Sequence, residues 1–102
     1  MDAIDVIKWE ELPEFKEIYD TLMYAKTVGP TEFEDVMPAN VSFLLHRLGY
    51  KFTKKEHLER YHSILFYFEG EDGTFQLDVE YWRMLVTVMF IPKDEVGVAY
   101  AE

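Results

Sequence analysis

Residues 63–80 read SILFYFEGEDGTFQLDVE, and this stretch decides the fold. Its first seven residues are rich in aromatic and β-branched types, which favour strands. Gly70-Glu71-Asp72-Gly73 follows, with the Asp-Gly chemistry of a tight hairpin turn. Beyond the turn every second residue is apolar as far as Tyr81, the period of a half-buried strand. The stretch therefore predicts a β-hairpin.

The chain after this hairpin predicts more sheet. Trp82 to Ile91 is apolar on both faces, which favours a central strand, although the pattern alone leaves a helix open. A bend near Glu80–Arg83 must separate this segment from the strand before it. Pro92–Glu95 is typical of a turn, and Val96–Tyr100 of a short edge strand. We expect a three- to four-stranded antiparallel sheet.

Before residue 63 the apolar spacing is that of helices. Pro13 suits the first position of a helix that Gly29-Pro30 would end. Thr31 with Glu34 forms a capping-box pattern for a short helix ended by Pro38, and Asn40 can cap a third helix that stops at Gly49. A fourth, over Thr53–Arg60, competes with a strand that would start at Tyr50.

Three or four short helices followed by an antiparallel sheet make an α+β protein. At 102 residues the chain fits one domain. We expect that domain to span residues 1–102, with helices over 1–62 and strands over 63–102.

Composition excludes several function classes. The chain has no cysteine, so disulfides, thiolate nucleophiles and cysteine-ligated metals are ruled out. No apolar run approaches the roughly 18 residues of a membrane span. The acidic start of the chain lacks the pattern of a secretory signal, so we expect a cytoplasmic protein without a membrane partner.

The net charge of −10 is unevenly distributed. Residues 1–38 carry ten acids against three bases, and residues 63–102 carry eight against two. Residues 39–62 reverse the balance, with five bases against two acids and all three histidines. Two acidic blocks therefore flank a basic island.

Residues suited to catalysis are scarce. The two serines, Ser42 and Ser63, lack the context of an activated nucleophile, and no glycine-rich phosphate loop exists. His57 and His62 are five residues apart, which does not place two ligands on one helix face. We expect no enzyme activity, no cofactor and no metal site.

The basic island suggests one alternative function. Helix, short helix, helix and hairpin is the element order of a winged helix-turn-helix domain, which the sequence resembles in pattern over about 45 residues. Asn40–Leu48 would be its recognition helix and Gly70–Gly73 its wing. The residues that would then bind DNA lie in Asn40–Lys55; they are Asn40, Arg47, Lys51, Lys54 and Lys55. The acidic wing would repel phosphate, so we expect weak or no binding to duplex DNA.

The acidic residues suggest a different function. Glu14, Glu17 and Asp20 step by three along one flank of the first helix, as a row that can imitate a phosphate track. Acidic inhibitors encoded by phages, including anti-restriction and some anti-CRISPR proteins, are similar in size, charge and lack of cysteine. The predicted partner-binding acids are Glu10, Glu11, Glu14, Glu17, Asp20, Glu34 and Asp35. We expect an inhibitor or adaptor that docks on a basic surface of a partner protein, in the host cytoplasm if a phage encodes it.

Aromatic residues support an interface. The chain has seven Tyr, two Trp and eight Phe, more than one small core needs, and these types are enriched at interface centres. The four that fall off or outside the predicted stripes are Trp9, Tyr24, Phe43 and Tyr100. The predicted edge strand at Val96–Tyr100 could also pair with a second copy of the chain to form a homodimer.

Overall fold

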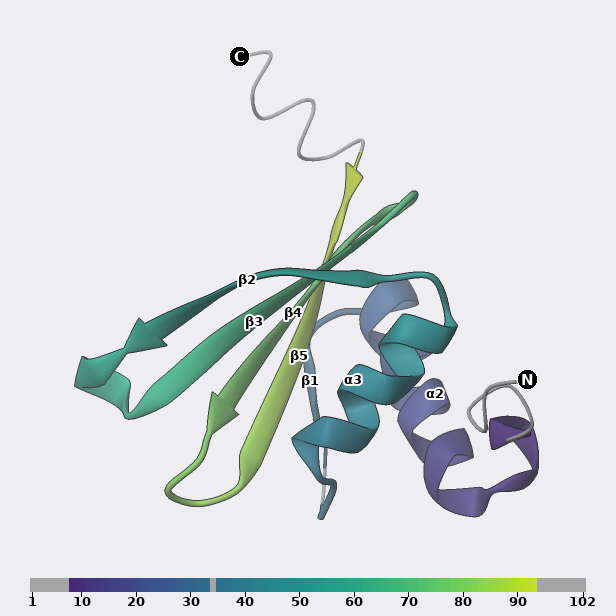
Figure 1. Cartoon of the computed structure of the whole chain (residues 1–102), viewed down its shortest axis with the longest axis horizontal. Coiled ribbons are helices and arrows are strands. Elements are labelled where there is room, and N and C mark those ends of the chain that lie inside the picture. Colours follow the sequence, from purple (N-terminus) through teal and green to yellow (C-terminus); the bar gives the residue numbers. More distant parts are fainter. Residues whose placement is uncertain (1–7, 34, 94–102) are drawn as a thin grey trace, which may run out of the picture.

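The computed structural model describes residues 8–33 and 35–93. These residues form an α+β fold in which two α-helices lie against a five-stranded antiparallel sheet (Figure 1). The elements are η1 (Trp9–Glu11), α2 (Pro13–Thr27), β1 (Thr31–Phe33), α3 (Pro38–Arg47), β2 (Lys51–Leu58), η2 (Glu59–Tyr61), β3 (Ser63–Gly70), β4 (Gly73–Glu80) and β5 (Leu85–Pro92). The strand order across the sheet is β1-β5-β4-β3-β2.

The predicted hairpin forms the centre of this sheet. β3 pairs with β4 from Ile64 opposite Val79 to Gly70 opposite Gly73. The segment after it is a strand, β5, and residues 81–84 make the turn that separates it from β4. These predictions are confirmed. The edge strand expected at Val96–Tyr100 lies outside the described residues.

The predicted short helix between Thr31 and Pro38 is wrong. Thr31–Phe33 forms the edge strand β1, because Phe33 is buried when it pairs with Val86 of β5. Pro38 does not end a helix but begins α3, where its missing N–H costs nothing. Asn40 is therefore the third residue of α3 rather than its cap.

The predicted helix over Thr53–Arg60 is also wrong, and the competing strand is what forms. β2 pairs with β3 along its whole length, from Lys51 opposite Glu69 to Leu58 opposite Ser63. The local capping pattern is outweighed by this ladder, since tertiary pairing commonly overrides local propensity. The prediction of helices over residues 1–62 is therefore only partly right, since this range also contains strands β1 and β2.

The winged-helix resemblance is not confirmed. A strand, β1, stands where that fold requires its second helix. The presumed wing is the β3–β4 hairpin, which is flanked by β2 on one side and β5 on the other. A wing must project from its domain to reach DNA, whereas these strands lie inside the sheet.

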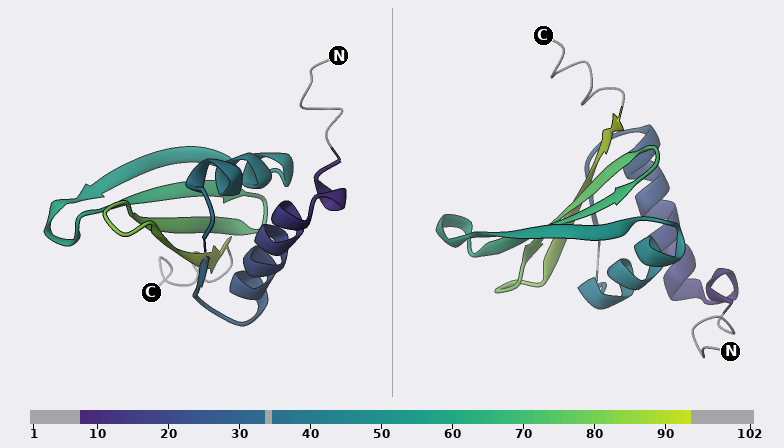
Figure 2. Two further views of the ribbon diagram at one scale, coloured as in Figure 1. Left: turned by 90° about the horizontal axis from the view of Figure 1, so that it is seen from below. Right: turned by 45° about the horizontal axis from the view of Figure 1, so that its top comes forward.

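The core lies between the helices and one face of the sheet. Ile18 and Leu22 of α2 are fully buried, as are Leu44 and Leu45 of α3. They pack with alternate residues of the inner strands, among them Phe75, whose side chain is also fully buried. The helices cover one end of the sheet only, and the β2–β3 and β4–β5 turns extend beyond them (Figure 2). Among the described residues, neither helix is long and apolar enough to cross a membrane.

Candidate interaction surfaces

Exposed acidic side chains are numerous on α2 and on the segments next to it in the chain and in the fold. We define the acidic face as the exposed carboxylates of η1, α2, β1 and the β1–α3 connection. They are Glu10, Glu11, Glu14, Glu17, Asp20, Glu32 and Asp35. Six of them were predicted from sequence. Glu32 was not among the predicted residues, and Glu34, which was, lies outside the described part of the chain.

The structure brings three of these carboxylates together from two elements. Glu17 and Asp20 of α2 and Glu32 of β1 line a hollow of about 420 Å³. Its remaining lining includes Ile18, Phe33 and Val36, so the hollow combines an apolar floor with an acidic rim. Such a site can accept the aliphatic stem of a lysine or arginine while its carboxylates meet the charge.

Two members of the predicted acidic row also make contacts within the chain. The Asn40 side-chain amide donates a hydrogen bond to Glu14 Oε1 (2.6 Å), which joins α3 to α2. Lys16 Nζ lies 3.9 Å from Asp20 Oδ1 across an exposed turn of α2. Glu14 thus helps to hold the two helices together, near the positive end of the α3 dipole.

The five residues predicted for DNA binding do not share a helix. Asn40 bonds to α2, and Arg47 is exposed at the last position of α3. Lys51, Lys54 and Lys55 lie on strand β2, and Lys54 Nζ stands 4.7 Å from the centre of the Tyr67 ring. The basic island is therefore mostly a sheet edge and not a recognition helix.

The four aromatic residues predicted for an interface differ in exposure. Tyr24 is exposed, whereas Phe43 is half-buried with its ring centre 5.4 Å from that of Phe15. Trp9 lies in η1, but its side chain is not among those that the structure describes. Tyr100 lies outside the described residues.

Several aromatic side chains that were not predicted from the sequence are also exposed. Tyr61, Tyr81 and Trp82 are each more than half exposed, in the turns at the free end of the sheet. Arg83 lies over the Trp82 ring at 5.2 Å and pairs with Glu80 (2.6 Å). The missed signal is the position of these residues at hairpin turns, where no neighbouring strand can cover them.

An apolar groove lies between α3 and the β2 edge. It measures about 310 Å³ and is lined by Ala39, Ser42, Phe43, His46, Phe52, Phe66 and Phe68. The four α3 residues follow the helical spacing of one face, and Phe43 among them also contacts Phe15 of α2. The sequence did not indicate this groove, because it left the segment after Tyr50 open between a strand and a helix over Thr53–Arg60.

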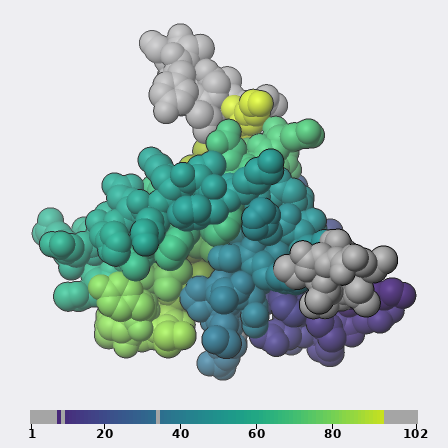
Figure 3. All heavy atoms as spheres, viewed as in Figure 1, coloured from purple at the N-terminus to yellow at the C-terminus, as the bar shows by residue number. Residues whose placement is uncertain are grey.

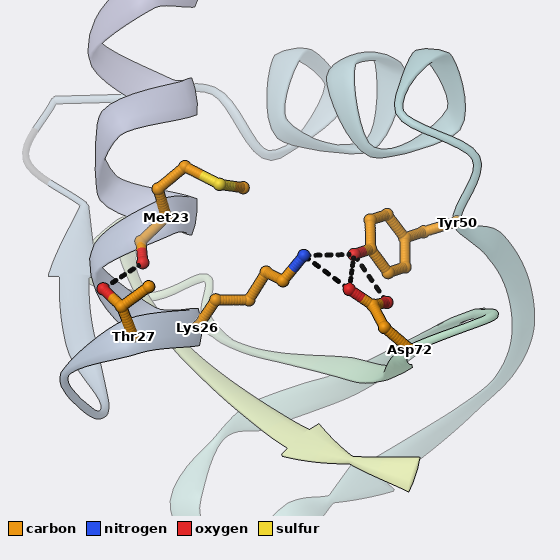
Figure 4. Close-up of polar contacts among 5 residues, drawn as sticks. All are labelled: Met23, Lys26, Thr27, Tyr50 and Asp72. Carbon is orange, nitrogen blue, oxygen red and sulfur yellow. Dashed lines mark hydrogen bonds and ion pairs between the residues drawn. The ribbon is translucent and has the colours of Figure 1, made fainter.

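A polar cluster joins three elements on the helix side of the sheet (Figure 4). Lys26 of α2 donates to the Tyr50 hydroxyl (3.1 Å) and pairs with Asp72, and the Tyr50 hydroxyl donates to Asp72 Oδ1 (2.8 Å). Nearby, the Thr27 hydroxyl donates to the Met23 carbonyl oxygen (2.8 Å). The cluster fixes the β3–β4 turn against the end of α2.

These contacts shift the titration of the cluster. Burial opposes the charged form of Asp72, but the hydrogen bonds from Lys26 and Tyr50 outweigh it, so the pKa of the carboxyl is lowered. The hydrogen bond to Asp72 raises the pKa of Lys26, and burial raises the pKa of Tyr50. Both charged partners are stabilised in their ionised forms, as a structural ion pair requires.

The potential metal-ligating side chains of the described residues are scattered over the fold. Within residues 8–33 and 35–93, no three His, Asp or Glu side chains are grouped to hold a metal ion. Ser42 lines the apolar groove, and Ser63 is buried at the start of β3. The surfaces that remain are the acidic face, the β2 edge with its groove, and the exposed aromatic turns.

No protein-family model matches the chain, and neither a curated protein nor a solved structure matches it significantly.

Proposed function

We propose that this protein is a non-enzymatic interaction module that docks through its acidic face on a basic surface of a partner protein. The observation that carries the proposal is the hollow with its acidic rim and apolar floor. Carboxylates on separate elements, Glu17 and Glu32 among them, would meet cationic side chains of the partner. Ile18, Phe33 and Val36 would contact the aliphatic stems of those side chains.

The charge of the whole molecule supports the same partner class. A net charge of −10 attracts basic surfaces and accelerates encounter with them. Since the basic surfaces of many proteins serve to bind nucleic acid, the docked module would act as an inhibitor or adaptor there, and a phage-type DNA mimic is one form of it. We place this activity in the cytoplasm, or in the host cytoplasm if a phage encodes the protein.

Duplex DNA is the weaker candidate partner. The three lysines of the basic island are on one strand edge, and Asn40 is bonded to Glu14. Phosphate contacts supply most non-specific DNA affinity, and a strongly acidic molecule opposes them. We therefore propose a protein partner.

Affinity capture with matched charge variants tests the proposal. In the test variant Glu10, Glu11 and Glu17 are changed to lysine; Glu14 and Asp20 are spared because they bond within the chain. In the control variant Glu59, Glu69 and Glu71, which are exposed on other elements, are changed to lysine. Both variants have the same net charge.

Each tagged protein is incubated with a lysate of the cells in which it occurs, and the captured proteins are identified by mass spectrometry. We expect a basic protein that the wild type and the control capture and the test variant does not. Capture of the same partner by all three would reject docking through the acidic face. If the tagged protein captures nucleic acid, and nuclease treatment abolishes the capture, a protein partner would be rejected.

A further inference from the structure

Strand β2 is an open edge of the sheet. It has eight residues, Lys51–Leu58, and β3 pairs with it on one side. Within the described chain no strand pairs with its other side. Seven of its eight side chains are exposed, whereas the opposite sheet edge, β1, is only three residues long. An open edge of this length offers backbone donors and acceptors to an added strand.

The two faces of β2 differ in chemistry. Its pairing with β3 places Lys51 and Lys54 on the face away from the helices, opposite Glu69 and Tyr67. A bulge at Thr53 interrupts the register there.

The face toward the helices carries Phe52 and Lys55, opposite Phe68 and Phe66. The edge therefore presents Lys51, Lys54 and Glu56 on one face, and Phe52, Lys55 and His57 on the other.

The apolar groove lies directly beside that phenylalanine. Phe52 is 49% exposed, and its ring centre lies 5.8 Å from that of Phe68 and 6.3 Å from that of Phe66. Across the groove stand Ala39, Phe43 and His46 of α3. Figure 3 shows this side of the molecule, with β2 across its upper part and α3 below it. A strand added to β2 would lay alternate side chains over Phe52 and into the groove.

We propose that β2 and this groove bind an extended acidic segment of a partner protein, which adds to the sheet as a sixth strand. Its acidic side chains face Lys51 and Lys54, and its alternate apolar side chains cover Phe52 and enter the groove. Main-chain hydrogen bonds supply affinity, and the lysines and the groove select an acidic–apolar alternation. This surface is separate from the acidic face, since β2 and β1 are opposite edges of the sheet.

The charge on β2 disfavours a second copy of this chain as the occupant. Two β2 strands paired antiparallel about Lys54 would place the Lys54 side chains of the two copies directly opposite each other, on the same face of the sheet. Like charges directly opposite destabilise a strand pair, and edge lysines are a common protection against self-association. The same lysines attract an acidic strand.

A designed peptide tests the proposal. The probe is a dye-labelled octapeptide of alternating Glu and Val or Phe, and its affinity for the full chain is measured by fluorescence anisotropy. A matched peptide has the same side chains but N-methylated amides along one edge, which removes the donors needed for strand addition. A third peptide has Lys in place of Glu.

Protein variants locate the binding site. Changing Lys51 and Lys54 to glutamate should lower the affinity for the first peptide by at least about tenfold, since both charge contacts become repulsive. Phe52→Ser removes the apolar contact. The control changes Lys8 and Lys93, exposed and far from β2 in sequence, to glutamate, with the same change in net charge. If Phe52→Ser fails to fold, the lysine variant still tests the site.

We expect the first peptide alone to bind, the control variant to retain its affinity, and amide NMR shifts to concentrate on β2 and the groove. Equal binding of the N-methylated peptide, shifts centred on α2, or no binding would each overturn the proposal. Sedimentation of the free protein tests the other occupant. If the free protein is a dimer that dissociates when Lys51 and Lys54 are changed to glutamate, β2 binds a second copy of the chain. That result would also overturn the proposal of an acidic partner segment.

Discussion

Asp72 lies in the β3–β4 turn, where its carboxylate meets Lys26 from α2 and Tyr50 from the α3–β2 connection. The hairpin prediction placed Asp72 in a tight turn between two strands. The hairpin pattern could not predict the partners of the Asp72 carboxylate. Lys26 and Tyr50 are 46 and 22 residues away in the sequence, and only the fold brings them close. For the same reason, sequence placed Glu14 in a binding row and Asn40 at a cap, while the structure bonds one to the other.

The cluster predicts a specific pH dependence of stability. The pKa of Asp72 is lowered below its ordinary value of 3.8, so its contribution is complete above that value and is lost as pH falls through the folded-state pKa. The pKa of Lys26 is raised above 10.5, so its contribution is complete below 10.5 and is lost as pH rises through the folded-state pKa.

Urea unfolding of the wild type and Asp72→Asn across pH checks this. We expect the wild type to be more stable near neutral pH, and the difference to shrink in acid as Asp72 protonates. Glu71→Gln, the neighbouring change in the same turn, is the control. A difference between wild type and Asp72→Asn that is independent of pH would show that the ion pair does not stabilise the fold.

At the scale of elements, strong local patterns were the predictable ones. α2 has a proline at its start and a continuous apolar stripe, and the β3–β4 hairpin has alternation and turn chemistry. β1 was missed, and β2 was left open between a helix and a strand from Tyr50, because their local patterns also suit helices and only pairing with β5 and β3 makes them strands. The apolar groove was missed with them, since it exists only where β2 passes beside α3.

Gly70 shows how one residue lets two elements meet. A Cβ built at Gly70 would lie 2.5 Å from the Tyr50 ring, which is closer than packed atoms approach. We therefore expect Gly70→Ala to destabilise the protein by about 1–3 kcal/mol, as overpacking does, whereas an unhindered Gly→Ala change would stabilise it.

Thermal unfolding of Gly70→Ala, Tyr50→Leu and the double variant checks the clash. The double variant should be more stable than the sum of the single effects predicts, because the smaller side chain relieves the overlap. Strict additivity would mean that Gly70 and Tyr50 do not constrain each other.

At the scale of the whole molecule, charge is separated across the sheet. β1 and α2 bring the acidic face to one edge, and β2 brings three lysines to the other. Sequence predicted the acidic and basic blocks, but their separation depends on the strand order, which places β1 beside β5 and β2 beside β3. The charge layout supports two separate docking surfaces on one small protein.

The association rate of the captured partner tests docking through the acidic face most directly. Surface plasmon resonance at low and physiological salt compares the wild type, the Glu10, Glu11 and Glu17 lysine variant, and the control with Glu59, Glu69 and Glu71 changed. We predict that the test variant associates at least about tenfold more slowly at low salt, with a weaker salt dependence, while the control stays near wild type. Equal association rates for the two variants would contradict the acidic face as the docking surface.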